Sequence, residues 1–319
     1  MKSDSFCKTI TLICGGVGGA KLARGVTRAY PGCRINIITN TADDTEFYGL
    51  HVSPDLDTIM YTLAGLSGAG RGWGINDDSF RCLGQLAQYG ETTWFQLGDR
   101  DFATHILRTR MLRAGKTLTQ VTSYLSRKLD ISARILPMTD QTVETFIGTD
   151  SGTIPFQEYF VREQQRVNIR QVTFKGITKA RPTMEVTDAI TSADLLIFAP
   201  SNPIASILPI LSLMGIKPLV AASSAFKLAV SPFKGGRAIS GPAKELMEAR
   251  GLDGSSGGLA RFYAGLIDVL LIHTEDEGER ESIEQIGIAA VTVETIMKDS
   301  ENSVQLSRKI YDIYAKWRG

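Results

Sequence analysis

The chain has 319 residues, of which 43% are hydrophobic and 22% charged, values typical of a globular enzyme with a sizeable core. Its 35 basic and 34 acidic residues leave a net charge of +1, which argues against nucleic acid as a bulk partner but permits a local nucleotide site. No run reaches the roughly 20 apolar residues of a membrane helix, and the cysteines lack zinc-type spacing, so we expect reduced thiols and a cytoplasmic protein.

Short apolar runs alternate with amphipathic stretches along the whole chain, a pattern that predicts βαβ units and a mostly parallel sheet. The runs are nearly continuous in Ile, Leu and Val, as in strands that helices cover on both faces. We therefore expect a single α/β domain over 1–319 with a doubly wound, Rossmann-like sheet. The expected strands are Thr9–Cys14, Ile35–Thr39, Thr93–Leu97, Leu195–Ala199, Leu219–Ala222, Val269–His273 and, as a further candidate, Ala290–Val293.

A glycine-rich loop, GGVGGAK over 15–21, follows the first expected strand and opens a helix. Glycines let the backbone approach a ligand closely, and the N–H groups at a helix start suit an anion. Lys21 stands where a dinucleotide fingerprint needs its third glycine, and the Gly-Lys-Ser/Thr of a P-loop is missing. A tight structural turn is the alternative to a phosphate or nucleotide site. The nucleotide-binding candidates here are Gly15, Gly16, Gly18, Gly19 and Lys21.

Four carboxylates follow the second expected strand: Asp43 and Asp44 first, then Asp55 and Asp57 in the motif Ser-Pro-Asp-Leu-Asp. Doubly wound sheets carry their active sites past the carboxyl ends of strands. Carboxylates of this kind suit Mg²⁺, which commonly binds one or two of them together with substrate phosphates. Any single aspartate could instead cap a turn or a helix. As a set, the four indicate a polar site for a metal.

A second polar cluster follows the expected strand Thr93–Leu97. Gln96 interrupts the apolar run near its carboxyl end, and Asp99 and Arg100 come directly after it. Asp99 could be a helix cap. Arg100 could meet a phosphate or pair with its acidic neighbours, and the sequence leaves both open.

The middle of the chain departs from the βαβ rhythm. Residues 101–130 have helical spacing, whereas 142–175 alternate around the turn at 150–152, which predicts a hairpin. We expect an inserted helical and antiparallel lobe at roughly 100–190. Beyond it, Ser201 and Asn202 lie between an apolar strand and a helix, where they could be ordinary caps or offer polar groups to a nucleotide.

Taken together, these segments resemble the family of 2-phospho-L-lactate transferases, which build coenzyme F(420), a deazaflavin redox carrier. The resemblance runs in matching order from about residue 10 to 275, and such an ordered set is specific. The matching segments are GGVGGAK (15–21), NTADD (40–44), SPDLDTIMYTL (53–63), GRGWG (70–74), WFQLGDRDFATHILRT (94–109), LPMTD (136–140), FQEYFV (156–161) and APSNPIASILPIL (199–211).

The resemblance implies a guanylyl-activated donor, in which a diphosphate links GMP to a small phosphorylated acid. The implied acceptor is Fo, a deazaflavin with a ribityl chain, whose terminal hydroxyl attacks the acyl-side phosphorus while GMP leaves. Phosphoryl transfer depends mainly on positioning and charge neutralisation, and Mg²⁺ is the expected cofactor. The donor acid stays open among phospholactate, phosphoenolpyruvate and phosphoglycerate, and the resemblance suggests a homodimer.

Carried onto this chain, the resemblance gives roles to the candidate residues. Asp57 and Gln96 correspond to acceptor-binding positions, although relatives often have a basic residue where this chain has Gln96. The expected set is catalytic Asp55 and Asp57; acceptor-binding Asp57, Gln96, Asp99 and Arg100; metal-binding Asp43, Asp44 and Asp55; and nucleotide-binding Ser201 and Asn202 beside the glycine loop.

Two alternatives belong to other classes. A nucleotide-binding regulatory or morphogenesis protein of the same fold would share the glycine loop and the Ser-Asn-Pro loop, but the intact Pro-Asp-Leu-Asp and Gly-Asp-Arg-Asp segments favour the enzyme. An NAD-dependent oxidoreductase is disfavoured by Lys21 and by Asn40, which stands where an acidic residue would hold the ribose.

Overall fold

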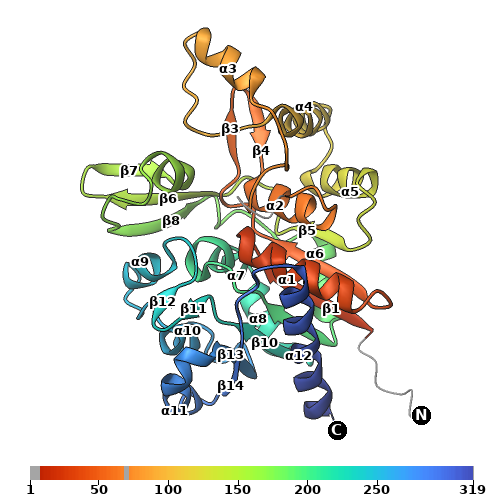
Figure 1. Cartoon of the computed structure of the whole chain (residues 1–319), viewed down its shortest axis with the longest axis vertical. Coiled ribbons are helices and arrows are strands. Elements are labelled where there is room, and N and C mark those ends of the chain that lie inside the picture. Colours follow the sequence, from red (N-terminus) through yellow and green to blue (C-terminus); the bar gives the residue numbers. More distant parts are fainter. Residues whose placement is uncertain (1–7, 68–71, 319) are drawn as a thin grey trace.

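The structure of the protein, a computed structural model, describes residues 8–67 and 72–318. Seven strands form one central sheet in the order β14-β13-β10-β9-β1-β2-β5, and every neighbouring pair is parallel (Figure 1). The strands are β1 (Thr9–Cys14), β2 (Arg34–Thr39), β5 (Arg134–Pro137), β9 (Leu195–Phe198), β10 (Phe226–Val230), β13 (Val269–His273) and β14 (Ala289–Val293).

Both faces of the sheet are buried because successive strand residues point to opposite sides. In β1, Leu12 and Cys14 belong to one apolar core and Ile13 to the other. The first core lies under α1 (Gly16–Ala29), α2 (Pro54–Leu63), α5 (Leu118–Lys128) and α12 (Ser300–Arg318). The second lies under α6 (Met184–Thr191), α7 (Leu208–Ser212), α8 (Ile216–Ala222), α9 (Ala243–Glu248), α10 (Ser256–Phe262) and α11 (Arg280–Glu284).

The chain order creates a switch point between β1 and β9. From β1 the chain proceeds to β2 and β5 on one side, and then returns to β9, β10, β13 and β14 on the other. Loops that leave neighbouring strands in opposite directions open a crevice at the carboxyl ends. The glycine loop after β1 and the Ser201–Asn202 loop after β9 therefore meet there.

Smaller elements surround this edge of the sheet. The hairpin β3 (Thr45–Phe47) and β4 (Leu50–Val52) extends with α3 (Arg81–Gln88) away from the sheet, at the top of Figure 1, and has its own small apolar core. The remaining elements are α4 (Asp99–Arg113), the antiparallel sheet β6 (Glu144–Thr149), β7 (Gly152–Pro155) and β8 (Gln171–Lys175), the hairpin β11 (Phe233–Lys234) and β12 (Arg237–Ala238), and the helical turns η1 (Glu158–Arg162), η2 (Pro203–Ile207) and η3 (Thr274–Glu279).

The predicted α/β class with a doubly wound, mostly parallel sheet is confirmed, and two of the predicted strands are wrong. Leu219–Ala222 lies in α8, and the strand is β10, four residues further on. Pro218 has no N–H to give to a central strand but is tolerated in the first turn of a helix. Thr93–Leu97 forms no strand, because Phe95 stacks on Phe47 with 4.2 Å between the ring centroids, which holds this segment on the β3–β4 hairpin.

The inserted part of the chain is not continuous. The antiparallel sheet at 144–175 was predicted, but β5, inside the expected lobe at 100–190, is the edge strand of the main sheet. Within residues 8–67 and 72–318, no single helix is long and apolar enough to cross a membrane. One bent pair, Pro203–Ser212 with Ile216–Ala222 at 89°, passes by length and composition only.

Candidate functional site

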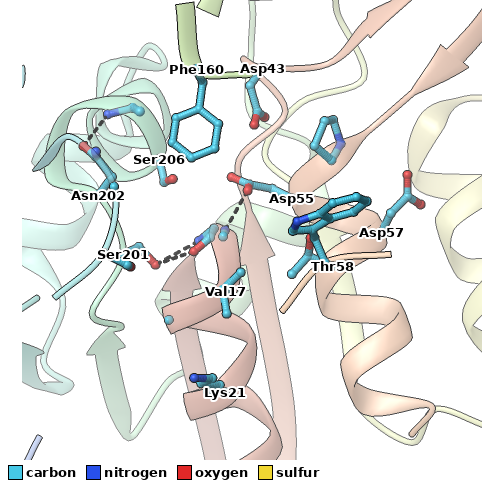
Figure 2. Close-up of a pocket in the computed structure, with 18 of the residues that line it drawn as sticks. Val17, Lys21, Asp43, Asp55, Asp57, Thr58, Phe160, Ser201, Asn202 and Ser206 are labelled. Atoms are coloured by element: carbon cyan, nitrogen blue, oxygen red, sulfur yellow. Dashed lines mark hydrogen bonds between the residues drawn. The ribbon is translucent and has the colours of Figure 1, made fainter. Parts of the chain in front are cut away.

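A cavity of about 770 Å³ lies over the carboxyl ends of β1 and β9. The glycine loop and the Asp55 carboxylate are at its centre, Asp57 lies to one side, and Ser201 and Asn202 lie to the other (Figure 2). This volume is in the range of pockets that enclose a drug-sized or cofactor-sized ligand. The lining alternates between acidic, amide and aromatic groups, so the cavity has both a polar centre and apolar walls.

Glycines are required in the loop because three chain segments meet there. A Cβ on Gly15 would lie 2.1 Å from Asp55 Oδ2, and a Cβ on Gly18 would lie 2.3 Å from the backbone oxygen of Pro200. The N–H of Gly16 donates to Asp55 Oδ1 at 2.6 Å. Helix α1 thus begins directly against the cavity, and Gly15, its N-cap residue, has no side chain to cap it. A helix start of this kind favours an anion.

Asp43 and Asp55 form a buried acidic pair in the cavity wall. The Asn40 side chain bridges them, because its Nδ2 donates to Asp43 Oδ1 and to Asp55 Oδ2, each at 3.0 Å. Burial raises the pKa of Asp55 to about 6. Burial, and then the neighbouring Asp55 carboxylate, raise the pKa of Asp43 well above its usual range. Two carboxylates held together in this way would be stabilised by a bound cation.

Asp44 points away from this pair. Its Oδ2 accepts a hydrogen bond from Ser53 Oγ at 2.7 Å and lies 3.0 Å from His51 Nε2. Burial raises the pKa of Asp44, whereas the hydrogen bond from His51 lowers it. Asp44 is not among the residues that line the cavity. The structure therefore brings together two of the three expected metal ligands and leaves Asp44 behind them.

The oxygen ligands of the acidic pair are of the kind that a magnesium ion prefers. Among the described residues, no group of three or more His, Cys, Asp or Glu side chains could hold a metal by itself. Mg²⁺ does not need such a cage, because it is usually bound by one or two carboxylates, with water and substrate phosphates as its other ligands. Asp43 and Asp55, beside the phosphate-binding type of helix start, offer that kind of donor set.

Asp57 also lines the cavity, and a buried arginine neutralises it. Arg108, 1% exposed, makes two hydrogen bonds to the Asp57 carboxylate, one of them from Nη1 to Oδ2 at 3.0 Å. Burial would lower the pKa of Arg108, but the Asp57 carboxylate outweighs this effect and raises it. Paired guanidinium–carboxylate contacts fix both groups in orientation. Asp57 is thus held in a defined orientation.

The pair continues into a chain of buried groups. Arg108 Nη1 lies 3.2 Å from His105 Nδ1, and His105 Nε2 lies 3.1 Å from Asp101 Oδ1. Tyr61 donates its hydroxyl hydrogen to the same Asp101 oxygen at 2.7 Å. Asp101, His105 and Tyr61 all line the cavity. This side of the cavity therefore has one carboxylate, Asp57, that can orient a hydroxyl and accept its proton, with buried polar groups packed behind it.

Gln96 lines the cavity, but its two expected companions do not. Asp99 accepts hydrogen bonds from Ser79 Oγ at 2.5 Å and from the Cys82 N–H at 2.9 Å, so it holds the loop before α3. Arg100 is exposed, and its Nη1 donates to the backbone oxygen of Asn76. Both side chains lie outside the cavity that was expected to bind the acceptor.

The loop after β9 forms the side of the cavity opposite Asp57. Ser201 Oγ accepts from the N–H of Gly15 at 3.0 Å and donates to the Gly15 carbonyl at 2.7 Å, which ties the two loops together. Asn202 Oδ1 accepts from the N–H groups of Ile204 and Ala205, so it is a helix cap. Of the other nucleotide-binding candidates, Gly15, Gly16, Gly18 and Lys21 line the cavity, whereas Gly19 packs against Cys14 and Ser201 behind it.

Sequence reasoning missed several lining residues. Behind the lining, Arg108 stands in the matching segment 94–109 without having been given a role, and its 1% exposure is what distinguishes it from an ordinary helix arginine. Phe156 and Phe160 stack with 5.6 Å between centroids at the wall formed by η1. Segments 239–243 and 295–298 also line the cavity. The predicted segment GRGWG begins at residues 70 and 71, outside the described residues, although Trp73 and Gly74 line the cavity.

Comparison with known proteins identifies relatives over almost the whole chain. A family model described as "2-phospho-L-lactate transferase CofD" matches residues 10–310. A phosphoenolpyruvate transferase of Streptomyces griseus is 39% identical over 310 residues, 95% of this chain and 98% of the relative. A 2-phospho-L-lactate transferase of Methanococcoides burtonii is 36% identical over 304 residues, 95% of this chain and 99% of the relative.

A solved structure from Bacillus halodurans shares the fold. It is described as a member of the upf0052 family, and it superposes with a TM-score of 0.66 at 17% identity, covering 96% of this chain and 99% of that one. At this identity the similarity supports the architecture of the sheet and its surrounding helices.

Proposed function

This chain belongs to the 2-phospho-L-lactate transferase (CofD) family, whose members act in the coenzyme F(420) pathway, and we propose that it transfers a phospho-acid group from a guanylyl donor to the deazaflavin Fo. The observation that carries the proposal is the buried Asp43–Asp55 pair beside the start of α1, inside a cavity of about 770 Å³. Such a site can hold a diphosphate and the metal that neutralises it.

The donor diphosphate would bind at the glycine loop. Its negative charge suits the start of α1, and Lys21 lines the same cavity. Burial lowers the pKa of Lys21, a sign that this ammonium group is partly withdrawn from water. The guanosine part would then extend toward Ser201 and Asn202, on the side away from Asp57 (Figure 2). Asn202 uses its side-chain oxygen as a cap, which leaves its amide N–H groups to a ligand.

The acceptor hydroxyl would bind on the Asp57 side. Arg108 holds the Asp57 carboxylate in place, so the carboxylate can accept a hydrogen bond from the terminal ribityl hydroxyl and aim its oxygen at the phosphorus. The same Asp57 carboxylate would take up the hydroxyl proton as the oxygen–phosphorus bond forms. The apolar walls around Phe95 and Phe160 are suited to a flat aromatic ring.

Asp43 and Asp55 would hold a magnesium ion, which would neutralise the donor diphosphate and the charge that develops on the phosphate of the departing GMP. The comparisons also bear on which acid is transferred. Of the two relatives reported above, the phosphoenolpyruvate transferase is 39% identical to this chain and the 2-phospho-L-lactate transferase 36%, which favours phosphoenolpyruvate. We therefore propose phosphoenolpyruvate as the acid in the donor.

Mass spectrometry of the reaction products tests this function. Purified protein is incubated with Fo, Mg²⁺ and one of three synthetic guanylyl donors that carry phosphoenolpyruvate, phospholactate or phosphoglycerate. The expected result is the phosphodiester of Fo from the phosphoenolpyruvate donor, with GMP as the second product. Turnover of the phospholactate donor alone would refute the proposed acid but keep the transferase. No product from any donor would refute the transferase itself.

The variant Asp99→Asn is a matched control in this assay. It changes an aspartate in the same Gly-Asp-Arg-Asp segment, but one whose hydrogen bonds lead to Ser79 and the backbone outside the cavity. We expect its KM for Fo to equal that of the unaltered protein. A large rise in that KM would show that Asp99 takes part in Fo binding and would contradict the geometry described above.

A further inference from the structure

Residues 294–298 connect the edge strand β14 to the long helix α12. Figure 1 shows the chain leaving β14 and crossing to the start of α12, which lies beside α1. Thr295, Ile296, Met297 and Lys298 line the same cavity as the glycine loop. No role in the site was expected for this segment from the sequence.

Hydrogen bonds fix both ends of the segment. At the first end, Glu294 Oε1 accepts from the N–H of Ile296 at 2.9 Å and lies 3.2 Å from His273 Nε2. The N–H of Glu275 donates to His273 Nδ1 at 3.0 Å, so His273 is protonated on Nε2 and donates to Glu294. At the other end, Asp299 Oδ1 accepts from the N–H of Asn302 in the first turn of α12.

Helix α12 is in turn locked onto α1. A Cβ on Gly25 of α1 would lie 2.2 Å from the backbone oxygen of Ser303 of α12, which shows how closely the two helices approach. The segment is thereby tied to the helix that begins at the glycine loop. Its distance from the diphosphate-binding end of α1 is set by packed backbone and does not depend on long side chains.

Thr295 is the member of this segment with an unsatisfied group. It is 2% exposed, and its hydroxyl is buried with no hydrogen-bond partner among the described residues. A buried hydroxyl without a partner is costly, and most buried polar groups in proteins are satisfied. Because Thr295 lines the cavity, a ligand is the partner that the fold leaves available to it.

The strand order of the sheet determines which substrate the 294–298 segment would contact. β14 lies on the β9 side of β1, whereas β2 and β5 lie on the other side with the acidic residues that follow β2. The path from β14 to α1 therefore crosses the carboxyl ends on the side of Ser201 and Asn202. Asp57 faces the opposite side (Figure 2).

We propose that Thr295 hydrogen-bonds the nucleoside part of the guanylyl donor, and that His273 and Glu294 are positioning residues that hold the 294–298 segment against it. This inference rests on the proposed function for the presence of a guanylyl nucleotide. It adds a contact from the C-terminal part of the chain, beyond the loops after β1 and β9. The segment would set how tightly the nucleotide binds and would leave Fo binding unchanged.

Calorimetric titration of the full-length protein with GDP and Mg²⁺, without Fo, tests the contact. Thr295→Val keeps the shape but removes the hydroxyl, and we expect GDP to bind about five- to tenfold more weakly, as for the loss of one net hydrogen bond. Thr295→Ser should bind as the unaltered protein does. The control is Thr122→Val, which removes another buried hydroxyl without a partner, on α5 and away from the cavity.

The positioning role has its own pair of variants. Glu294→Ala should weaken GDP binding, whereas Glu294→Gln should not, because its amide oxygen can still accept from Ile296 and His273. The thermal midpoint of each metal-free variant is measured alongside, so that a general loss of folding is recognised.

The outcomes separate the two proposals. If the unaltered protein binds no GDP, the proposed function fails, and the inference fails with it. If that protein binds GDP and Thr295→Val binds it equally well, the inference is overturned while the function stands. Equal weakening by Thr295→Val and Thr122→Val would also overturn it, since the effect would then belong to the fold.

Discussion

Replacing Asp55 by asparagine should stabilise the metal-free protein at neutral pH. The fold raises the pKa of Asp55 to about 6, from an ordinary value of 3.8. Because the folded-state pKa lies above the unfolded one, the stability of the fold falls as pH rises from 3.8 to about 6. Above this interval the ionised carboxylate destabilises the folded protein. Two pH units correspond to about 3 kcal/mol. Asparagine places an N–H group opposite Asn40, which offsets about 1 kcal/mol. The expected gain is about 1–2 kcal/mol.

Urea denaturation in EDTA measures this gain. Asp55→Asn and the unaltered protein are compared at pH 8 and at pH 4.5. The variant should be more stable at pH 8, and the difference should shrink at pH 4.5, where the carboxyl of the unaltered protein is largely protonated in the folded state. A variant less stable than the unaltered protein by 1 kcal/mol or more at pH 8, or a difference independent of pH, would refute the reasoning.

Three further predictions follow from the same site. Arg108→Met should lower the free energy of unfolding by about 3–5 kcal/mol, since it leaves the buried Asp57 carboxylate without a partner. Adding Asp57→Asn to this variant should recover part of that loss, and no recovery in urea denaturation would contradict the pairing. Gly18→Ala should cost about 1–3 kcal/mol and weaken GDP binding, because its Cβ would lie 2.3 Å from a carbonyl oxygen, whereas Gly32→Ala, with nothing within 4 Å, should change neither. Finally, kcat/KM measured at subsaturating Mg²⁺ should fall as pH drops below about 6, where metal-free Asp55 becomes protonated and binds the ion less well, and a profile flat down to pH 5 would be evidence against a role for its charge.

The sequence was sufficient to predict the α/β class and the strands β1, β2, β9, β13 and β14, because buried parallel strands are short, apolar and followed by polar loops. Asp43 and Asp55 could be proposed as metal ligands, together with Asp44, since all three lie in the segment that follows β2. Asp44, next to Asp43, could not be distinguished from it by sequence. Its side chain faces His51 and Ser53 because adjacent residues point in different directions.

The acceptor side was predicted less well, and helical phase is the physical reason. Asp99 and Arg100 were chosen for their nearness to a strand end, but residues 99–113 form a helix, α4. Residues spaced four and seven apart share a helix face. Asp101, His105 and Arg108 therefore face inward together, while the two chosen residues do not. The helix at 101–130 was predicted, but its polar residues were not assigned to a face, and doing so would have found the buried set.

The contribution of residues 295–298 to the cavity lining could not be predicted from the sequence. It lies nearly 280 residues beyond the glycine loop, and it contacts the cavity only because β14 and α12 return the chain across the sheet. Nothing in the residues Thr-Ile-Met-Lys indicates a binding site. Contacts of this kind depend on the three-dimensional path of the chain.

The most direct test of the account is the rate of GMP release from the guanylyl donor. The central claim is that Asp43 and Asp55 hold the metal that makes GMP a good leaving group once Fo is bound. The account predicts release only when Fo and Mg²⁺ are both present, loss of release in EDTA, and a rate about 10²–10³ lower in Asp55→Asn. Undiminished Fo-dependent release in EDTA, or by Asp55→Asn, would contradict it.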